Sequence, residues 1–170
     1  MVGQMRTLTR LGFSATAMVV VAASTVTLGA GIASANSPVP INSVLRRCDF
    51  SAVQTWTQVL RTSAGRGVAN IHTSGSTVVA DVNMVISNSP GAHYDIGLIQ
   101  MPRPSSETCG PGDPGTTFTG LDTDGAGVAN VTITAPLRQG ATGVWVFVAS
   151  PHPNNQAPAE FYTSEYVSPV

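Results

Sequence analysis

The sequence predicts an all-β fold, an antiparallel β-sandwich of about seven to eight strands, with a small β-barrel as the second choice. Short runs rich in Val, Thr, Ile and aromatic residues recur along the chain, and clusters of Gly, Pro, Asn and Asp separate them. No run shows the roughly 3.6-residue apolar period of an amphipathic helix. Short strands divided by turn residues in this way are typical of sandwiches and barrels.

The segment over 1–35 is organised as a signal peptide. Arg6 and Arg10 precede an uncharged apolar run over 11–32, and an A-x-A cleavage motif follows this run. We predict cleavage after Ala35, with no membrane span left in the mature chain and with the protein secreted or held in the cell envelope. A retained membrane anchor is the alternative.

The mature chain is expected to consist of a Pro-rich lead over 36–47 and a single β-sandwich domain over 48–170, since a chain of this length can bury a core of its own. Every basic residue is Arg, and two of the eight precede the predicted cleavage point, which leaves six Arg against nine Asp and Glu and a formal charge of -3. This balance argues against a nucleic acid partner, because binding phosphates requires a basic surface.

The strands expected before residue 90 lie at 50–60, 67–73 and 77–87. The last of these is the clearest, because its apolar residues recur with a period of two and therefore share the face that turns toward the core. These inward residues are Val78, Ala80, Val82, Met84 and Ile86.

A strand over 93–101 follows a turn at "SPG", and its Tyr94, Ile96 and Leu98 lie on one face. Because strands 77–87 and 93–101 are consecutive and joined by a short turn, we expect them to pair as a hairpin. Further strands are expected over 116–121, 128–135, 143–150 and 161–167.

The Pro- and Gly-rich segment over 102–117, which contains "CGPGDPG", is a loop that is either functional or tied down. The chain has two cysteines, Cys48 and Cys109, and export places them in an oxidising compartment where a pair usually closes. We therefore predict a Cys48–Cys109 disulfide, within one chain or between two, that ties the loop and stabilises the fold by about 4 kcal/mol. The sequence has no third cysteine and no C-x-x-C pair, so zinc-thiolate and redox chemistry are not indicated.

The stretch "LDTDGAGVANVTI" raises the question of a calcium loop. Asp122, Asp124 and Gly127 match the first, third and sixth positions of an EF-hand loop. The twelfth position, which requires a bidentate carboxylate, is Ile133, so the cage cannot close. We interpret the stretch as a turn, with positive φ at Asp124 and the glycine after it, that leads into a strand. The N-x-T sequence at Asn130 is interpreted as accidental, because a glycan would project from the middle of that strand.

The run "GVWVFVAS" is apolar on both faces, because Trp145 and Phe147 alternate with valines. Either both faces are covered or an aromatic face is exposed. In the second case Trp145, Phe147 and Trp56 form a candidate binding surface for sugars, lipids or a partner protein. We favour the arrangement in which Trp145 and Phe147 face the core and the valines line the other side.

His93 and Asp95 lie two residues apart on one strand face, where the carboxylate could orient the imidazole for catalysis or metal binding. The histidines show no H-x-H or H-E-x-x-H spacing, and the sequence has no G-x-S-x-G elbow and no phosphate-binding glycine loop. We therefore predict no catalytic residue, no metal and no cofactor. An exported hydrolase or metal-dependent enzyme that uses His93 and Asp95 is the alternative.

The turn and strand "TDGAGVANVT" resemble the T-D-x-x-G-x-A-x-V-T pattern of many bacterial immunoglobulin-like domains, which implies an immunoglobulin-like sandwich. Most of the mature chain resembles a group of small exported actinobacterial proteins of unknown function, mycobacterial ones especially. The stretches that carry this resemblance are "RRCDFSAV", "AHYDIGLIQMPRP", "CGPGDPG", "GATGVWVFV" and "PAEFYTSEYV". The resemblance implies export and brings no catalytic residues. We expect a monomeric, non-enzymatic binding or structural module whose partner is an unknown protein or an envelope component.

Overall fold

The computed structural model describes residues 38–53, 65–151, 154 and 158–170. Within these residues the chain forms β strands and no helix, so the prediction of an all-β fold is confirmed. The strands are β1 (Val39–Asn42), β2 (Arg66–Ser74), β3 (Thr77–Val85), β4 (His93–Met101), β5 (Thr116–Asp122), β6 (Val128–Pro136), β7 (Gly143–Ser150), β8 (Glu160–Ser164) and β9 (Ser168–Pro169).

Several predictions fall outside the described residues. The predicted signal peptide, Trp56 and most of the strand expected over 50–60 all lie there. In the part of the chain that the structure describes, no helix is long and apolar enough to cross a membrane.

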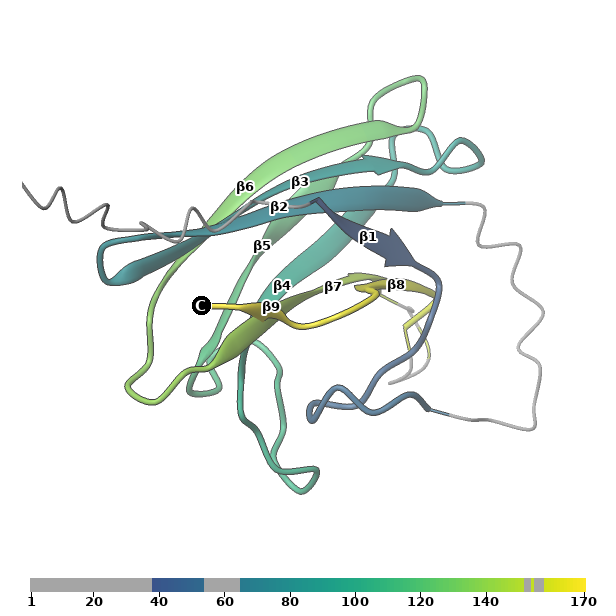
Figure 1. Cartoon of the computed structure of the whole chain (residues 1–170). Helices are drawn as coiled ribbons and strands as arrows, with labels where there is room; N and C mark the ends of the chain where they lie inside the picture. Colours follow the sequence, from purple (N-terminus) through teal and green to yellow (C-terminus); the bar gives the residue numbers. More distant parts are fainter. Residues whose placement is uncertain (1–37, 54–64, 152–153, 155–157) are drawn as a thin grey trace, which may run out of the picture. The chain divides into compact units, whose positions relative to one another are not determined.

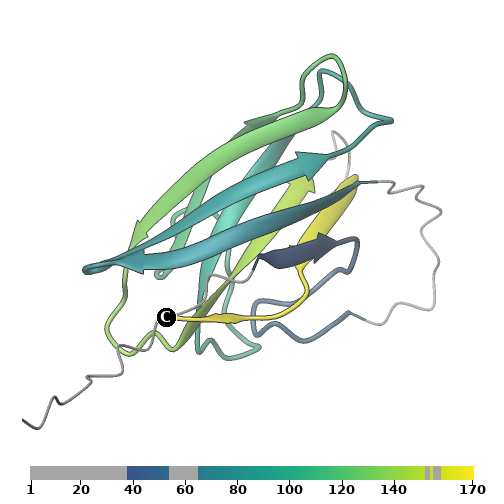
Figure 2. The same ribbon diagram turned by 45° about the horizontal axis from the view of Figure 1, so that its top comes forward.

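The strands form one antiparallel sheet in the order β5-β4-β7-β8-β1-β2-β3-β6, and the short β9 pairs with β7. The two end strands, β5 and β6, are joined by the turn over 123–127 and lie near one another without forming a ladder. The sheet is therefore curled on itself and nearly closed into a barrel (Figure 1, Figure 2). This arrangement fits the second choice of the sequence prediction, whereas a two-sheet sandwich is not confirmed.

The core lies inside the curled sheet and follows from the period-two alternation of the strands. All five residues of β3 and the turn after it that were expected to face inward are buried, and so are Tyr94, Ile96 and Leu98 of β4. The core cluster comprises Val39, Ile41, Ala69, Ile71, Val78, Ala80, Val82, Met84, Ile86, Tyr94, Ile96, Leu98, Leu121, Ala129, Ile133, Ala135, Val144, Val146, Val148 and Tyr162.

The predicted hairpin between strands 77–87 and 93–101 is wrong. β3 pairs with β2 on one edge and with β6 on the other, while β4 pairs with β5 and β7. Both edges of β3 are thus occupied, and the "SPG" turn carries the chain into the other half of the sheet order. Turn residues specify a change of direction but do not specify the strand that becomes the partner.

The predicted Pro-rich lead contains a strand. β1 pairs with β2 and β8, and its Val39 and Ile41 are buried in the core. The prolines on either side of Val39 concealed this strand, because proline cannot donate a ladder hydrogen bond and is depleted in strands. The strand expected over 161–167 is β8, which ends earlier, at Ser164.

The stretch "LDTDGAGVANVTI" forms the predicted turn and leads into β6. The Asp124 carboxylate closes this turn by accepting hydrogen bonds from the backbone N–H groups of Ala126, at 2.8 Å, and Val128, at 2.9 Å. The expected position of the positive φ was wrong, since φ is +76° at Gly127. A Cβ atom on Gly127 would lie 2.3 Å from the carbonyl oxygen of Ile86, so this position requires glycine.

Candidate functional site

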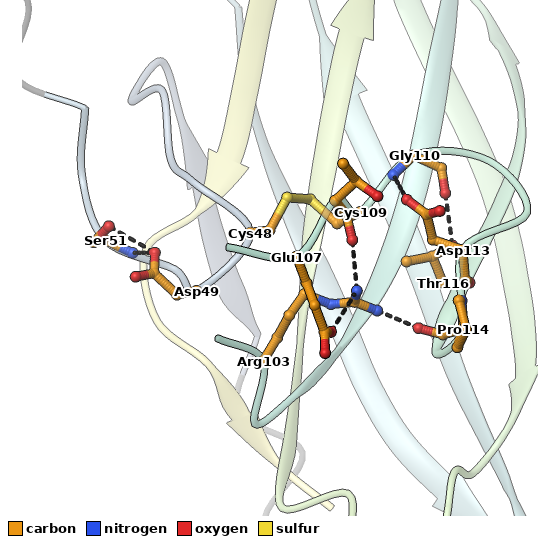
Figure 3. The surroundings of a disulfide bond; sticks show 11 residues. Cys48, Asp49, Ser51, Arg103, Glu107, Cys109, Gly110, Asp113, Pro114 and Thr116 are labelled. Atoms are coloured by element: carbon orange, nitrogen blue, oxygen red, sulfur yellow. Dashed lines mark hydrogen bonds and ion pairs between the residues drawn. A yellow bond between two sulfur atoms is a disulfide. The ribbon is translucent and has the colours of Figure 1, made fainter. Parts of the chain in front are cut away.

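Cys48 and Cys109 form the predicted disulfide within one chain, with an S–S distance of 2.08 Å and a Cα–Cα distance of 5.5 Å. The bond joins the segment over 43–53 to the long loop between β4 and β5 (Figure 3). A disulfide of this kind is consistent with an oxidising, extracytoplasmic location. The long loop therefore has the tie that the sequence predicted.

The same loop is organised around the buried side chain of Arg103 (Figure 3). Its Nη1 donates to the carbonyl of Thr108 at 2.6 Å and to the carboxylate of Glu107 at 3.2 Å, and its Nη2 donates to the carbonyl of Pro114. A buried guanidinium is costly unless its donors are paired, so these contacts hold the loop in one path.

A hollow of about 290 Å³ lies beside this loop. Its charged groups are engaged with the loop itself: Asp113 accepts from the N–H of Gly110 at 2.7 Å, and Arg138 donates to the carbonyl of Pro102 at 2.5 Å. We therefore assign this hollow to loop structure. It is lined by Arg103, Glu107, Thr108, Asp113, Pro114 and Arg138.

β7 corrects the favoured arrangement of the "GVWVFVAS" run. Its valines at 144, 146 and 148 enter the core, so Trp145 and Phe147 lie on the opposite, outer face of the sheet. The error arose because both faces of β7 are covered, and the apolar content of a strand then no longer tells which face meets the core.

Trp145 is only 1% exposed although it lies on the outer face, because the segment over 43–53 covers it. The ring of Phe50 packs edge-on against the indole with 5.5 Å between ring centroids, and the guanidinium of Arg46 lies 4.0 Å from the centre of the Phe50 ring. Phe147 is half-buried, 6.4 Å from Trp145 between ring centroids. The segment over 43–53 thus covers Trp145, while Phe147 stays partly exposed.

His93 lies on the outer face of β4 between two carboxylates. Its Nδ1 is 2.6 Å from Asp122 Oδ1, and its Nε2 is 3.7 Å from Asp95 Oδ1. The hydrogen bond to Asp122, together with the charges of both carboxylates, raises the pKa of His93 above its ordinary value, and the imidazole is 53% exposed. This environment favours the protonated form of the ring, which forms ion pairs with both carboxylates.

Sequence reasoning identified His93 and Asp95 but missed Asp122. Asp122 is the cross-strand partner of His93 in the β4–β5 ladder, and strand pairing was the only signal that would have revealed it. Among the described residues, no group of three or more His, Cys, Asp and Glu side chains is arranged to hold a metal ion.

Two buried tyrosines share one carboxylate at the interior of the sheet. The hydroxyl of Tyr94 donates to Glu160 Oε2 at 2.7 Å, and the hydroxyl of Tyr162 donates to Glu160 Oε1. Burial raises the pKa of Tyr94 to about 12 and also raises the pKa of Tyr162 well above its ordinary value. Both phenols therefore remain neutral donors, and the cluster links β4 to β8.

A polar hollow of about 300 Å³ lies on the outer face of β3 and β6. In the β3–β6 ladder Asp81 lies opposite Thr132 and Asn83 lies opposite Asn130, so four polar side chains form two adjacent cross-strand rows. The hydroxyl of Thr132 donates to Asp81 Oδ1 at 2.5 Å. The hollow is lined by Asp81, Val82, Asn83, Asn130, Val131 and Thr132.

The hydrogen-bonding groups of this hollow are open to solvent. Asn83, Asn130 and Thr132 are exposed, and Asp81 is half-buried. Val68 of β2 lies opposite Asn83 on the same face and is 38% exposed, so an apolar side chain borders the polar rows.

The sequence contained part of this site. The period-two pattern of the strand over 77–87 places Asp81 and Asn83 outward, and the N-x-T motif marks Asn130 and Thr132. The two pairs meet only because β3 pairs with β6, a contact between strands that are not consecutive.

No family model, curated protein or solved structure matches this chain.

Proposed function

We propose that the protein is an exported, non-enzymatic binding module, and that the polar hollow between β3 and β6 is the surface that meets its ligand. The observation that carries this proposal is the convergence of three polar side chains on one face, the exposed Asn83 and Asn130 and the half-buried Asp81. They lie on two strands whose pairing runs without interruption from Val85 to Thr77. Groups held on a rigid sheet lose little conformational freedom when a ligand binds, which favours affinity.

The rest of the molecule supports a role as a scaffold outside the cytoplasm. The disulfide between Cys48 and Cys109 suits an oxidising compartment. We further propose that the fold is an immunoglobulin-like sandwich, which requires the curled sheet to divide into two facing sheets. Two places favour such a division: the β1–β8 ladder has only the pairs of Ile41 and Asn42, and β5 and β6 form no ladder with one another. The expected partner is a component of the cell envelope, bound by a monomer.

An exported hydrolase or metal-dependent enzyme that uses His93 and Asp95 is the second candidate. The 2.6 Å contact between His93 and Asp122 favours it, because a carboxylate of this kind can fix the tautomer and orientation of an imidazole. A His93→Ala variant distinguishes the two functions: the binding module keeps its ligand and metal content unchanged, whereas the enzyme loses turnover or metal.

The binding proposal is tested with protein recovered from the culture fluid of its own host. Intact mass spectrometry is expected to give a chain that begins at Asn36, lighter by the two hydrogens of the disulfide. Cosedimentation with insoluble envelope material is then compared for wild type, Asn83→Ala and Asn130→Ala. Loss of one hydrogen-bonding side chain is expected to weaken binding about three- to tenfold in each variant.

Thr134→Val is the matched control, because Thr134 is exposed on the same face of β6 but does not line the hollow. It is expected to cosediment like the wild type. If Asn83→Ala and Asn130→Ala also behave like the wild type, the hollow is not the binding surface and the proposal is wrong.

A further inference from the structure

The charges around the hollow restrict the class of ligand that it can take. Asp81 is the only ionisable residue that lines it, and the nearest Arg of the neighbouring strand, Arg66 of β2, lies opposite Val85 and not opposite Asp81. An anionic ligand would place its charge against the Asp81 carboxylate, and no cation lines the hollow to compensate it, which is unfavourable. A calcium site is also disfavoured, because calcium takes six to eight oxygen ligands, most of them held in a loop, and the hollow supplies only one carboxylate.

Neutral hydroxyl groups fit the same side chains. A hydroxyl both donates and accepts, a carboxamide does the same through its two ends, and a carboxylate accepts. Asp81 already accepts one bond from Thr132, which fixes the carboxylate and leaves its second oxygen for a ligand donor. The amides of Asn83 and Asn130 lie side by side in the neighbouring cross-strand row, so adjacent hydroxyls on one ligand can be bonded by both rows.

The apolar border matches the remaining surface of such a ligand. Val68 and Val85 are 38% and 43% exposed and lie on the same outer face as Asn83. Exposed valines beside polar groups give an apolar contact for C–H groups while the polar rows take the hydroxyls. A ligand with hydroxyls along its edge and C–H groups on its face is a sugar ring.

We propose that the β3–β6 hollow binds a neutral glycan through Asp81, Asn83 and Asn130, with Val68 and Val85 in contact with the sugar ring. This inference rests on the proposed function and adds the chemical class of the ligand. The hollow is a shallow site on the face of a sheet, so it holds a segment of a longer polysaccharide in preference to an enclosed small molecule.

The test is affinity electrophoresis of the disulfide-bonded protein in native gels that contain glycogen, mannan, arabinogalactan or soluble β-glucan, with dextran sulfate as the anionic comparison. At least one neutral polysaccharide is expected to retard the wild type, and dextran sulfate is expected to have no effect. Asn83→Ala and Asn130→Ala are each expected to raise the dissociation constant about three- to tenfold.

A matched pair of substitutions on β6 separates site from fold. Thr132→Val and Thr134→Val both exchange a β-branched residue for another, so both preserve the strand. Thr132→Val removes the hydroxyl that holds Asp81 and is expected to weaken retardation about threefold or more, whereas Thr134→Val is expected to leave it unchanged. Circular dichroism confirms that both variants are folded.

The outcomes distinguish this inference from the proposed function. If no neutral polysaccharide retards the protein while the hollow variants still lose envelope binding, the glycan assignment is wrong and the binding surface stands. If neither assay responds to the hollow variants, both are wrong. Retardation that EDTA abolishes would show a metal-bridged site and would overturn direct recognition by the three side chains.

Discussion

Breaking the disulfide is expected to release the segment over 43–53 from the outer face of β7. The bond links residues 61 positions apart in the chain. Closing a loop of that length lowers the conformational entropy of the unfolded state, which stabilises the folded state by about 4 kcal/mol. Domains of this size unfold at a cost of about 5–15 kcal/mol. A Cys48→Ser/Cys109→Ser variant is therefore expected to fold but to be close to the threshold of stability.

The same variant is expected to uncover Trp145. Phe50 covers the indole from a segment that the disulfide fixes at Cys48, two residues away in the chain. Without the bond, only weaker contacts hold this segment, such as the hydrogen bond from Arg46 to the carbonyl of Glu165 at 3.2 Å. The segment then exchanges between attached and released states, and solvent reaches the indole.

Urea unfolding and acrylamide quenching measure the two effects. The chain has two tryptophans, so the experiment is done in a Trp56→Phe background, in which Trp145 is the only indole that emits. We expect a loss of about 4 kcal/mol in the free energy of unfolding and a clear increase in quenching of Trp145. A loss below about 1 kcal/mol with an indole that stays protected would refute the role of the disulfide as the tie of this segment.

The remaining predictions concern pH and backbone geometry. Burial raises the pKa of Tyr94 to about 12, so the neutral phenol stabilises the fold fully below about pH 10, and this contribution is lost as the pH rises from there toward 12. The urea midpoint of unfolding should fall across this range, and it should fall less steeply in Tyr94→Phe. Because the pKa of His93 is raised, its ion pairs stabilise the fold fully below about pH 6.5, and this stabilisation is lost as the pH rises through the raised pKa. An NMR titration of His93 should give a lower pKa in Asp122→Asn than in the wild type, and an unchanged pKa would contradict the contact between His93 and Asp122. Gly127→Ala is expected to destabilise the protein by more than about 1 kcal/mol because φ is positive and the site has no room for Cβ, whereas Gly125→Ala, in open space, should change stability by less than about 0.5 kcal/mol in the same thermal melts.

Local sequence patterns predicted most of the strands, and they predicted the inward face where apolar and polar residues alternate clearly. The alternation in β3 and the turn after it predicted five inward residues, and the structure buries all of them: Val78, Ala80, Val82, Met84 and Ile86. Such patterns succeed because the side-chain period of a strand is a property of the backbone, independent of what lies on either side. The two cysteines and the acidic turn at Asp124 were interpretable for a similar reason: each depends on chemistry carried by the residues themselves.

The partners of the strands were decided by tertiary structure. The "SPG" turn looked like a hairpin, yet β3 pairs with β6, whose partner residues lie about fifty positions away, as Asp81 and Thr132 do. Both candidate sites therefore depend on which strands pair. His93 lies beside Asp122 because β4 pairs with β5, and Asn83 lies beside Asn130 because β3 pairs with β6.

Burial of Trp145 had the same origin. Its own strand is apolar on both faces, so the alternation could not tell the core from a covered exterior. The structure buries Trp145 through Phe50, a residue from the far N-terminal side that the disulfide brings into place. The sequence by itself determined a disulfide-bonded, all-β chain and the inward faces of the strands that alternate clearly, such as β3 and β4, because those features are local. Which faces and side chains come together was decided only by the tertiary structure, since strand pairing depends on the packing of the whole sheet.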